Sequence, residues 1–487
     1  MENILDRIVR QKKQEVAQFH QQYDLNELRR TTRPGNRSFY EKLAAYKKRG
    51  IPFFIAEFKR QSPSEGWINQ HIDLATQVRS YADSGAAAIS VLTDSTFFGG
   101  SYADLQATAL ALDAPEQPNA PLLLQKDFIL DPIQIYLARR HGADIILLIA
   151  AALPPEQLLF LKKTAEQLGM GVLVEVHDQA ELDRVQKLDF PVLGINNRDL
   201  KTFRTALNRT NVLARQARGR FVVAESGIRD YRDFQVVRNA DGFLIGTSLM
   251  AQPEYGIRSA ECGLAHHFGV GGNSKLNRLF KACGIRTPAL LNQSVADFVG
   301  LNFSPVSQRQ IDPDLLTGRE LPAHAVAVFY KNTEAEIREV LARFPFRRVQ
   351  LYTGDVTPEF VRSLKQKVLL ACRVQAVADL EQLENYAADV DLFILDGAVP
   401  GSGQPIDATI PVNFPYPFLL AGGMNATNLE RVALFPNCIG VDIASGIETD
   451  GAVDMEKIKA IERRLREINQ QPIANSQLPH STPQMHQ

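Results

Sequence analysis

Short apolar runs recur along the chain, and most are followed by a segment with helical periodicity. In the first half the apolar runs predict strands at 52–58, 86–92, 121–126, 143–149, 171–176, 191–195, 220–224 and 241–245. Between them the periodicity predicts helices at 132–141, 154–168, 178–187, 208–216 and 230–238, and another from 253 onward. Because the runs are mainly apolar instead of alternating between apolar and polar residues, each predicts a parallel strand that is covered on both faces. Eight such repeats in about 250 residues favour a closed (β/α)8 barrel over an open sheet.

The same alternation resumes after an interruption at 266–274 (HHFGVGGNS). Eight further apolar runs lie at 279–283, 298–303, 325–329, 349–352, 368–372, 392–396, 418–423 and 439–442. Two helical segments, 4–20 and 38–48, precede the first strand. We therefore predict an α/β protein with two fused (β/α)8 TIM barrels, the first with an extra N-terminal helical extension. The predicted domains are 1–265 and 275–470, with a linker at 266–274 and a disordered tail at 471–487.

Composition agrees with two domains and excludes some partners. The chain has 487 residues, 45% of them hydrophobic, with 54 Lys and Arg against 55 Asp and Glu. Single cores rarely exceed about 300 residues, so more than one core is expected. The near-zero net charge gives no overall field for nucleic acid or an anionic membrane. We expect neither as a partner, and the lack of a membrane-spanning run or signal peptide predicts a cytoplasmic location.

The four cysteines, Cys262, Cys283, Cys372 and Cys438, are far apart in the sequence. No C-x-x-C pair is present, and the nine histidines do not cluster at ligand spacing. This spacing favours reduced thiols over a disulfide framework or a zinc site. We expect no metal.

Charged and amide residues end several of the predicted strands. Glu57 and Lys59 are two residues apart, so they share one face of their strand. A structural ion pair on an edge strand would explain one such segment. The same pattern, an apolar run that ends in charged or amide residues, recurs however in the runs that end near Lys126, Glu175, Asn196 and Glu225. Since barrel enzymes carry their chemistry at the carboxyl ends of strands, these residues predict an active site.

Small residues follow the last two strands of each half. They are Ser226, Gly227, Gly246 and Thr247 in the first half and Gly422, Gly423, Ser445 and Gly446 in the second. Such residues leave backbone N–H groups open to an anion, which is the usual phosphate site of these barrels. Their recurrence at the same place in both halves predicts two phosphorylated substrates.

These ordered motifs resemble the bifunctional indole-3-glycerol-phosphate synthase and phosphoribosylanthranilate isomerase family of tryptophan biosynthesis, up to about residue 470. The first half carries AEFKRQSPS at 56–64, SVLTD at 90–94, FGGS at 98–101, KDFI at 126–129, VEVH at 174–177, GINNRDL at 194–200 and ESGI at 225–228. The second carries KACG at 281–284, VGLNFSPVSQR at 299–309, VQL at 349–351, LD at 395–396, GSGQ at 401–404 with Asp407, LAGG at 420–423 and GVDIASG at 440–446.

For the first half the resemblance implies decarboxylative ring closure of a carboxyphenylamino-deoxyribulose phosphate to indole-3-glycerol phosphate. It assigns Lys126 as the general acid for ring closure. Lys59 and Glu175 become the acid and the base for loss of water, and Glu57 and Glu225 position and charge-balance the lysines. Further residues that the resemblance places on the substrate are Asn196 and Arg198 for the carboxylate and hydroxyls, and Phe98 and Phe128 for the aryl ring.

For the second half it implies isomerisation of N-(5-phosphoribosyl)anthranilate to 1-(2-carboxyphenylamino)-1-deoxyribulose 5-phosphate. Asp396 matches the acid that protonates the ring oxygen, and Cys283 matches the base that removes a carbon-bound proton. These roles call for a raised pKa of the Asp396 carboxyl and a lowered pKa of the Cys283 thiol. Arg309 matches the position that faces the anthranilate carboxylate. The implied partners are small phosphorylated anthranilate derivatives, with no cofactor.

The chain departs from the family pattern at three places. Tyr352 and Thr353 stand where His is usual, no lysine lies near Cys372, and Glu65 replaces a common basic residue. An aldolase that uses Lys59 or Lys126 for a Schiff base is one alternative. Another is an active synthase whose second barrel is impaired and mainly binds or stabilises. Contact with other tryptophan-pathway enzymes is left open by the sequence.

Overall fold

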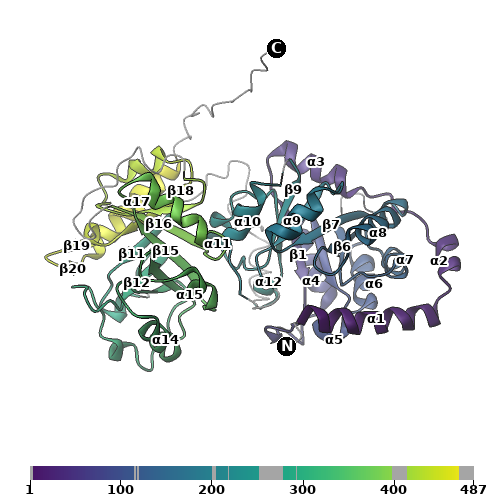
Figure 1. Cartoon of the computed structure of the whole chain (residues 1–487), viewed down its shortest axis with the longest axis horizontal. Coiled ribbons are helices and arrows are strands. Elements are labelled where there is room, and N and C mark those ends of the chain that lie inside the picture. The colour runs from purple at the N-terminus through teal and green to yellow at the C-terminus, as the bar shows by residue number, and fades with distance from the viewer. Residues whose placement is uncertain are drawn as a thin grey trace, which may run out of the picture.

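The computed structural model describes residues 4–113, 117, 120–199, 204–217, 219–251, 278–291, 293–397 and 414–470. Its first half is a closed parallel barrel (Figure 1), made of β1 (Phe53–Phe58), β4 (Ala88–Leu92), β5 (Leu122–Lys126), β6 (Ile145–Ile149), β7 (Gly171–Val176), β8 (Val192–Asn196), β9 (Phe221–Glu225) and β10 (Gly242–Ile245). β1 pairs with both β4 and β10, which closes the sheet.

The second half is another closed parallel barrel, in which β11 pairs with both β12 and β18. Its strands are β11 (Leu279–Cys283), β12 (Phe298–Asn302), β13 (Ala325–Val328), β14 (Arg348–Tyr352), β15 (Lys367–Arg373), β16 (Leu392–Asp396), β17 (Phe418–Leu420) and β18 (Cys438–Ile443). The predicted pair of fused TIM barrels is thus confirmed. The predicted linker at 266–274, the helix from 253 and the tail at 471–487 lie outside the described residues.

Helices cover the strands less regularly in the second barrel than in the first. The first is surrounded by α4 (Leu74–Asp83), α6 (Tyr102–Ala111), α7 (Pro132–Arg140), α8 (Pro155–Gln167), α9 (Gln179–Gln186), α10 (Asn208–Ala214) and α11 (Tyr231–Val236). In the second, α14 (Glu334–Arg343), α15 (Pro358–Ser363), α16 (Val377–Glu381) and α17 (Met455–Gln470) alternate with 3-10 turns such as Pro288–Leu290 and Pro313–Leu316. None of the described helices is long and apolar enough to cross a membrane.

The predicted N-terminal extension consists of α1 (Ile4–Gln22), α2 (Leu25–Thr31) and α3 (Phe39–Arg49). α3 starts at the N-cap Ser38 and stops at Gly50, which adopts the left-handed φ of 64° that favours glycine. Phe39 of α3 packs edge-on against Phe53 at the start of β1, with ring centroids 5.9 Å apart. α3 therefore covers the amino ends of the strands and leaves their carboxyl ends open.

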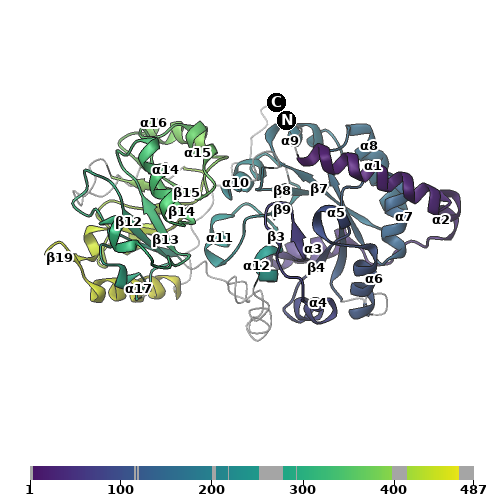
Figure 2. The same ribbon diagram turned by 90° about the horizontal axis from the view of Figure 1, so that it is seen from below.

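The two barrels lie side by side, with α10 and α11 of the first between them (Figures 1 and 2). Around α10, the Asn208 Nδ2 donates to the carbonyl of Ala387 at 2.9 Å, and the backbone N–H of Leu207 donates to Asp391 at 3.1 Å. Around α11, Arg348 of β14 lies 3.4 Å from Asp233. The first barrel thus presents loops from the carboxyl ends of its strands to the amino ends of β14, β15 and β16.

Candidate active sites

A cavity of about 770 Å³ opens at the carboxyl ends of the first barrel's strands. Every residue that the sequence assigns to the synthase site lines it, namely Glu57, Lys59, Phe98, Lys126, Phe128, Glu175, Asn196, Arg198, Glu225, Ser226, Gly227, Gly246 and Thr247. These side chains reach the cavity from widely separated segments because parallel strands all end at one rim. The rings of Phe98 and Phe128 lie 6.1 Å apart on one wall.

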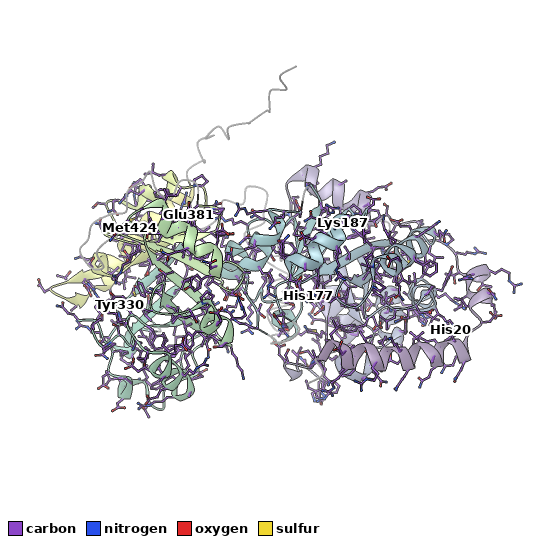
Figure 3. All side chains as sticks on the ribbon, viewed as in Figure 1. His20, His177, Lys187, Tyr330, Glu381 and Met424 are labelled. Carbon is purple, nitrogen blue, oxygen red and sulfur yellow. The ribbon has the colours of Figure 1, made fainter. Side chains whose placement is uncertain are left out.

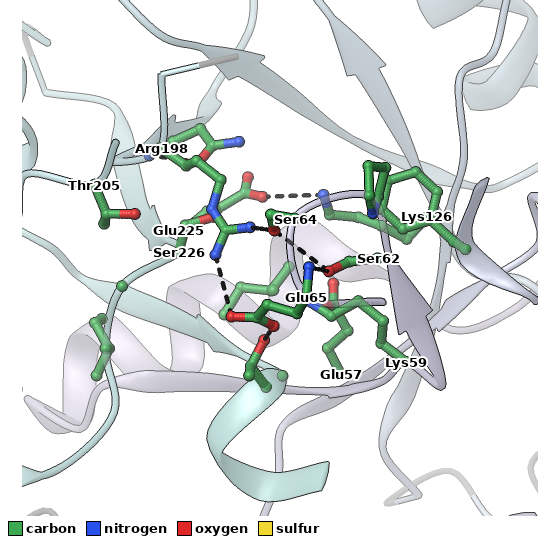
Figure 4. A pocket seen from close by; sticks show the side chains of 18 of the residues that line it. Glu57, Lys59, Ser62, Ser64, Glu65, Lys126, Arg198, Thr205, Glu225 and Ser226 are labelled. Atoms are coloured by element: carbon green, nitrogen blue, oxygen red, sulfur yellow. Dashed lines mark hydrogen bonds and ion pairs between the residues drawn. The ribbon is translucent and has the colours of Figure 1, made fainter. Parts of the chain in front are cut away.

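Two lysines and three carboxylates line this cavity, and Figure 4 labels both lysines together with Glu57 and Glu225. The Nζ of Lys126 lies 3.3 Å from Glu175 and 3.4 Å from Glu225. Separately, the Nζ of Lys59 lies 2.9 Å from Glu57. All three carboxylates are buried, so each relies on its lysine and on nearby donors in place of water. The arrangement gives two separate lysine centres, which suits a reaction that needs two acids.

The two carboxylates around Lys126 differ in protonation. Burial would raise the pKa of Glu175, but the charge of Lys126 and the hydrogen bond from His177 hold it well below its ordinary range. Burial does raise the pKa of Glu225, and the neighbouring Glu175 adds to the rise against the opposing charge of Lys126. Burial alone would lower the pKa of Lys126, but the negative charges of Glu175 and Glu225 outweigh this effect and raise the pKa. Near neutral pH the cluster therefore holds a charged lysine, a charged Glu175 and a protonated Glu225.

His177 supports Glu175 and is absent from the predicted site. It lies in the first barrel (Figure 3), with its Nε2 3.0 Å from Glu175 and its Nδ1 3.1 Å from Glu181. Burial lowers the pKa of His177, but hydrogen bonds to these two carboxylates raise it to about 10. His177 is thus an imidazolium that fixes Glu175 from the side opposite Lys126. In the sequence, His177 comes two residues after Glu175 at the end of a predicted strand, and this spacing could have indicated that it supports Glu175.

Lys12 is the second supporting residue that the sequence did not reveal. Its Nζ lies 2.8 Å from Asp127, 2.9 Å from Asp94 and 2.7 Å from Glu15, and the side chain is 1% exposed. Asp127 directly follows Lys126, and Asp94 caps α5 (Ser95–Phe98). Lys12 therefore pins α1 beside the cavity. The sequence feature that could have revealed Lys12 is its position four residues after Ile8, on the apolar face of α1, where a lysine is unusual.

The predicted phosphate end of the cavity is occupied by a carboxylate of the chain itself. Thr247, which opens α12 (Thr247–Ala251), donates its hydroxyl to Glu65 at 2.9 Å. Arg198 lies 3.8 Å from the other oxygen of Glu65 and donates to the hydroxyl of Ser64. Glu65 belongs to the hairpin of β2 (Gln61–Ser62) and β3 (Gly66–Trp67), and Figure 4 shows its side chain beside Arg198 and Ser64 in the cavity. If the phosphate binds here as predicted, we expect it to displace this carboxylate.

We expect Glu65→Gln to lower the synthase KM for its phosphorylated substrate by about two- to fivefold, the range of a partly exposed charge interaction. The glutamine keeps the size of the side chain but removes the anion that competes at Thr247 and Arg198. Steady-state kinetics at low ionic strength measure the effect, with Glu334→Gln on the exposed first turn of α14 as the matched charge control. A raised KM would show that Glu65 assists binding instead.

Two glycines leave room for the buried carboxylates. A Cβ placed on Gly194 would lie 2.0 Å from Oε1 of Glu225, and one on Gly246 would lie 2.4 Å from Oε1 of Glu57. Both separations are far below van der Waals contact. Gly246, which the sequence assigns to phosphate binding, thus also makes space for Glu57.

Gly194→Ala is expected to lower kcat for indole formation by about 100-fold, the cost of displacing a site group by about 1 Å. The added methyl group must push Glu225 away from Lys126. Isomerase activity of the same chain should stay unchanged and serves as the folding control. A variant with normal indole formation would show that the distance between Glu225 and Lys126 is unimportant.

In the second barrel, the predicted acid and base lie at strand ends around Tyr352. Cys283 ends β11, Asp396 ends β16 and Tyr352 ends β14. Burial raises the pKa of Asp396 to about 6, and Asp442 adds to the rise. Burial also raises the pKa of Tyr352 well above its ordinary value, and Asp396 and Cys283 add to it, so this residue stays a neutral phenol. Its oxygen accepts a hydrogen bond from Gln350 at 3.2 Å.

The pKa of Cys283 differs from the expectation. Burial raises the pKa of the thiol above its ordinary value, and the nearby Lys281 lowers it only in part. Lys281 is itself fully buried and lies 2.9 Å from Asp442, so its charge is shared between two partners. The sequence motif contains this lysine two residues before the thiol, and the structure shows that Asp442 also binds it.

Alkylation of Cys283 by iodoacetamide is therefore expected to be slow at pH 7 and to rise with pH. Because burial raises the pKa of this thiol, the reactive thiolate is a minor fraction, which increases about tenfold per pH unit below the pKa. Lys281→Met should slow the reaction further, because removing the ammonium raises the pKa. Mass spectrometry of the Cys283 peptide measures the rate separately from the other cysteines. A rate that is flat above pH 7 would contradict the raised pKa.

Arg309, the predicted contact for the substrate carboxylate, is held by Glu448. The Nε and Nη2 of Arg309 lie 2.6 and 2.7 Å from the two carboxylate oxygens of Glu448 in β19 (Glu448–Thr449). This is the bidentate geometry in which arginine binds carboxylates most strongly. The guanidinium of Arg309, which is predicted to bind the substrate carboxylate, is therefore paired with a carboxylate of the chain itself, as Arg198 is with Glu65.

The predicted phosphate residues of the second barrel lie together. Gly422 and Gly423 follow β17 with φ of 79° and 64°, and Ser445 starts a 3-10 turn after β18. A Cβ on Gly446 would lie 2.2 Å from the carbonyl oxygen of Met424, so the two segments are in direct contact. The motif residues 401–404 and Asp407 lie outside the described residues. Within the described part of the chain, no group of three His, Cys, Asp or Glu could hold a metal ion.

Comparisons with known proteins match both halves of the chain. The family model for indole-3-glycerol phosphate synthase matches residues 5–260, and that for N-(5'phosphoribosyl)anthranilate isomerase matches residues 280–464. The tryptophan biosynthesis protein TrpCF of Vibrio parahaemolyticus is 33% identical over 96% of this chain and 95% of its own length. TrpCF of Helicobacter pylori is 31% identical over 96% of this chain and 100% of its own length.

A solved phosphoribosyl anthranilate isomerase from Thermus thermophilus is 27% identical, covers 39% of this chain and 99% of its own, and has a TM-score of 0.35. The family models and the full-length relatives decide the assignment. The chain belongs to the indole-3-glycerol phosphate synthase and phosphoribosylanthranilate isomerase family, as a bifunctional enzyme of tryptophan biosynthesis that is both a lyase and an isomerase.

Proposed function

We propose that the second barrel converts N-(5-phosphoribosyl)anthranilate to 1-(2-carboxyphenylamino)-1-deoxyribulose 5-phosphate, and that the first barrel closes this product to indole-3-glycerol phosphate. The main support for the proposal is the contact of Lys126 with Glu175 and Glu225, which brings a charged lysine, a charged carboxylate and a neutral carboxyl group together in one buried cavity. A ring closure that needs an acid and then a base requires such a set.

In the first barrel, Lys126 donates a proton to the substrate carbonyl oxygen while the aryl carbon attacks the carbonyl carbon. Carbon dioxide then leaves and the ring regains aromaticity. Once Lys126 has given up its proton, the largest of the charges that depress the pKa of Glu175 is gone, and this carboxylate becomes a stronger base although His177 remains beside it. Glu175 can then accept the ring proton while Lys59 protonates the departing hydroxyl. Glu57 keeps Lys59 charged and oriented.

Substrate anions are bound around this centre by Arg198 and by the backbone of the segments 226–227 and 246–247. Asn196 donates to Glu175 at 3.3 Å and accepts from the backbone N–H of Arg198 at 3.0 Å, so it links the catalytic carboxylate to the anion-binding arginine. The neutral form of Glu225 avoids a further negative charge beside a substrate that already carries a carboxylate and a phosphate.

In the second barrel, Asp396 protonates the ring oxygen of the aminoaldose, and Cys283 removes the proton from the adjacent sugar carbon. A pKa of about 6 makes Asp396 a better proton donor near neutral pH than an ordinary aspartate. The Lys281 ammonium stabilises the thiolate form of Cys283. Retention of Cys283, Asp396 and Arg309 favours an active isomerase over a barrel that only binds or stabilises.

The proposed domain limits are 1–265 and 275–470, which agree with matches that end at residue 260 and resume at residue 280. Small phosphorylated anthranilate derivatives are the proposed partners, without nucleic acid or membrane, as the net charge of −1 supports. The unpaired Cys283, Cys372 and Cys438 support a reducing, cytoplasmic location.

The test follows both half-reactions of the purified chain. Phosphoribosylanthranilate made in situ should disappear, and indole-3-glycerol phosphate should form in equal amount. Conversion of only the deoxyribulose intermediate would overturn the isomerase assignment and point to Tyr352. Loss of phosphoribosylanthranilate without indole formation would overturn the synthase assignment.

A further inference from the structure

Residues of the second barrel form part of the wall of the first barrel's cavity. They are Phe346 and Arg347, just before β14, and Lys365, Gln366 and Lys367, at the start of β15. These positions lie at the amino ends of their strands. The predicted isomerase site lies at the carboxyl ends, so these residues are remote from the isomerase chemistry and adjacent to that of the synthase.

Lys367 contacts the predicted phosphate loop of the synthase, which we define as residues 226–229. Its Nζ donates to the carbonyl oxygen of Gly227 at 2.9 Å and lies 2.6 Å from the carboxylate of Asp233. The other oxygen of Asp233 accepts from the backbone N–H of Arg229 at 2.8 Å. One ammonium from the second barrel therefore holds the phosphate loop directly at Gly227 and, through Asp233, at Arg229.

The backbone of the phosphate loop needs such support. Ser226 has a φ of 65° and Gly227 a φ of 86°, so two successive residues are left-handed and one of them carries a side chain. Left-handed non-glycine residues persist only when the surrounding structure holds them. A Cβ on Gly227 would also lie 2.3 Å from Thr205, which leaves the loop little freedom to rearrange on that side.

Lys367 also fixes the direction of a backbone donor. The peptide between Gly227 and Ile228 is planar and trans, so its C=O and N–H groups point in opposite directions. When Lys367 holds the oxygen, the N–H of Ile228 is directed away from Lys367. Among the described residues none accepts a hydrogen bond from this N–H, while Ile228 lines the cavity. The donor is therefore available to a substrate phosphate.

We propose that Lys367 of the isomerase barrel is a positioning residue for the synthase reaction, which holds the phosphate loop in the form that binds the substrate phosphate. The inference rests on the proposed function of the first barrel. It means that the second barrel completes the synthase site. The synthase reaction therefore depends on the isomerase barrel, whereas the isomerase reaction does not depend on the synthase barrel. The barrels are adjacent at α11, which follows this loop (Figures 1 and 2).

The experiment uses the full chain and measures three quantities for each variant: the synthase KM and kcat, inhibition by inorganic phosphate, and isomerase activity. Lys367→Met should raise KM and the phosphate inhibition constant together by about tenfold, the value of one hydrogen bond from a charged group. Its kcat should change less than about twofold, since the lysine centres are untouched. Lys367→Arg, which keeps a charged donor, should restore most of the affinity.

Asn208→Ala is the matched control, because it also removes a side-chain donor to a carbonyl across the domain interface, at the same 2.9 Å, but away from the phosphate loop. It should leave KM and phosphate inhibition unchanged. Isomerase activity reports folding in every variant. Should Lys367→Met lose isomerase activity as well, Lys367→Gln replaces it, and a raised KM is again expected.

Normal KM and phosphate inhibition in the folded Lys367 variant would overturn the inference, and so would an equal loss in Asn208→Ala, which would reduce Lys367 to one of several interface contacts. Absence of indole formation by the unaltered chain would instead contradict the proposed function. The two failures are therefore distinguishable.

Discussion

Lys126→Ala is expected to lower kcat for indole formation by about 1,000-fold or more, since a positioned general acid contributes about 10²–10⁴-fold. The change removes the proton donor and also leaves Glu175 and Glu225 without their shared cation. Without the charge of Lys126 the pKa of the buried Glu175 rises, so this carboxylate is less well stabilised in the ionised form that acts as a base. Steady-state assay with the deoxyribulose intermediate measures the effect.

Two controls separate this loss from misfolding. Isomerase activity of the Lys126→Ala chain should stay at the level of the unaltered chain, and Lys163→Ala, on the exposed side of α8, should affect neither reaction. If indole formation persisted above about one tenth of its normal rate, Lys126 could not be the acid of ring closure.

Asp396→Asn is expected to lower kcat for the isomerase reaction by about 100- to 10,000-fold, the contribution of a general acid. Asparagine has nearly the same shape but cannot donate a proton to the ring oxygen. Consumption of phosphoribosylanthranilate measures the loss, and indole formation from the deoxyribulose intermediate should be unaffected.

Asp314→Asn is the matched control, because its side chain is 79% exposed and pairs with Arg343 of α14. It should leave both reactions unchanged. Near-normal isomerase activity in Asp396→Asn would show that another group protonates the ring oxygen, and the neutral phenol of Tyr352 would be the next candidate.

The sequence predicts the barrels and their strand ends well because both depend on local pattern. Apolar runs such as 143–149 become buried strands close to the expected place, here Ile145–Ile149. Once the strands are parallel and the barrel closes, residues such as Lys126 and Glu225, almost one hundred positions apart, must meet at one rim. That is why every synthase residue assigned from the sequence lines a single cavity.

The supporting residues could not be predicted because they depend on how separate elements cross. Lys12 meets Asp94 and Asp127 only because α1 runs across the barrel beside them. Lys367 reaches Gly227 only through the packing of one barrel on the other. The contacts of Glu65 and Glu448 depend on hairpins whose placement no periodicity specifies.

The expected pKa of Cys283 was wrong for a related reason. The sequence places a lysine two residues before the thiol, on the same face of the strand. It does not show that burial of the thiol outweighs that charge or that Asp442 shares it. For Asp396, burial raises the pKa of the carboxyl group, which is the change that its proposed role as a proton donor needs.

The most direct test of two separate serial sites mixes two inactive variants. Lys126→Ala retains only the isomerase site, and Asp396→Asn retains only the synthase site. Each alone should form almost no indole-3-glycerol phosphate from phosphoribosylanthranilate, whereas an equimolar mixture should form it through the intermediate released into solution. Failure of the mixture, with each variant still active in its own half-reaction, would contradict the account, and so would full activity of either variant alone.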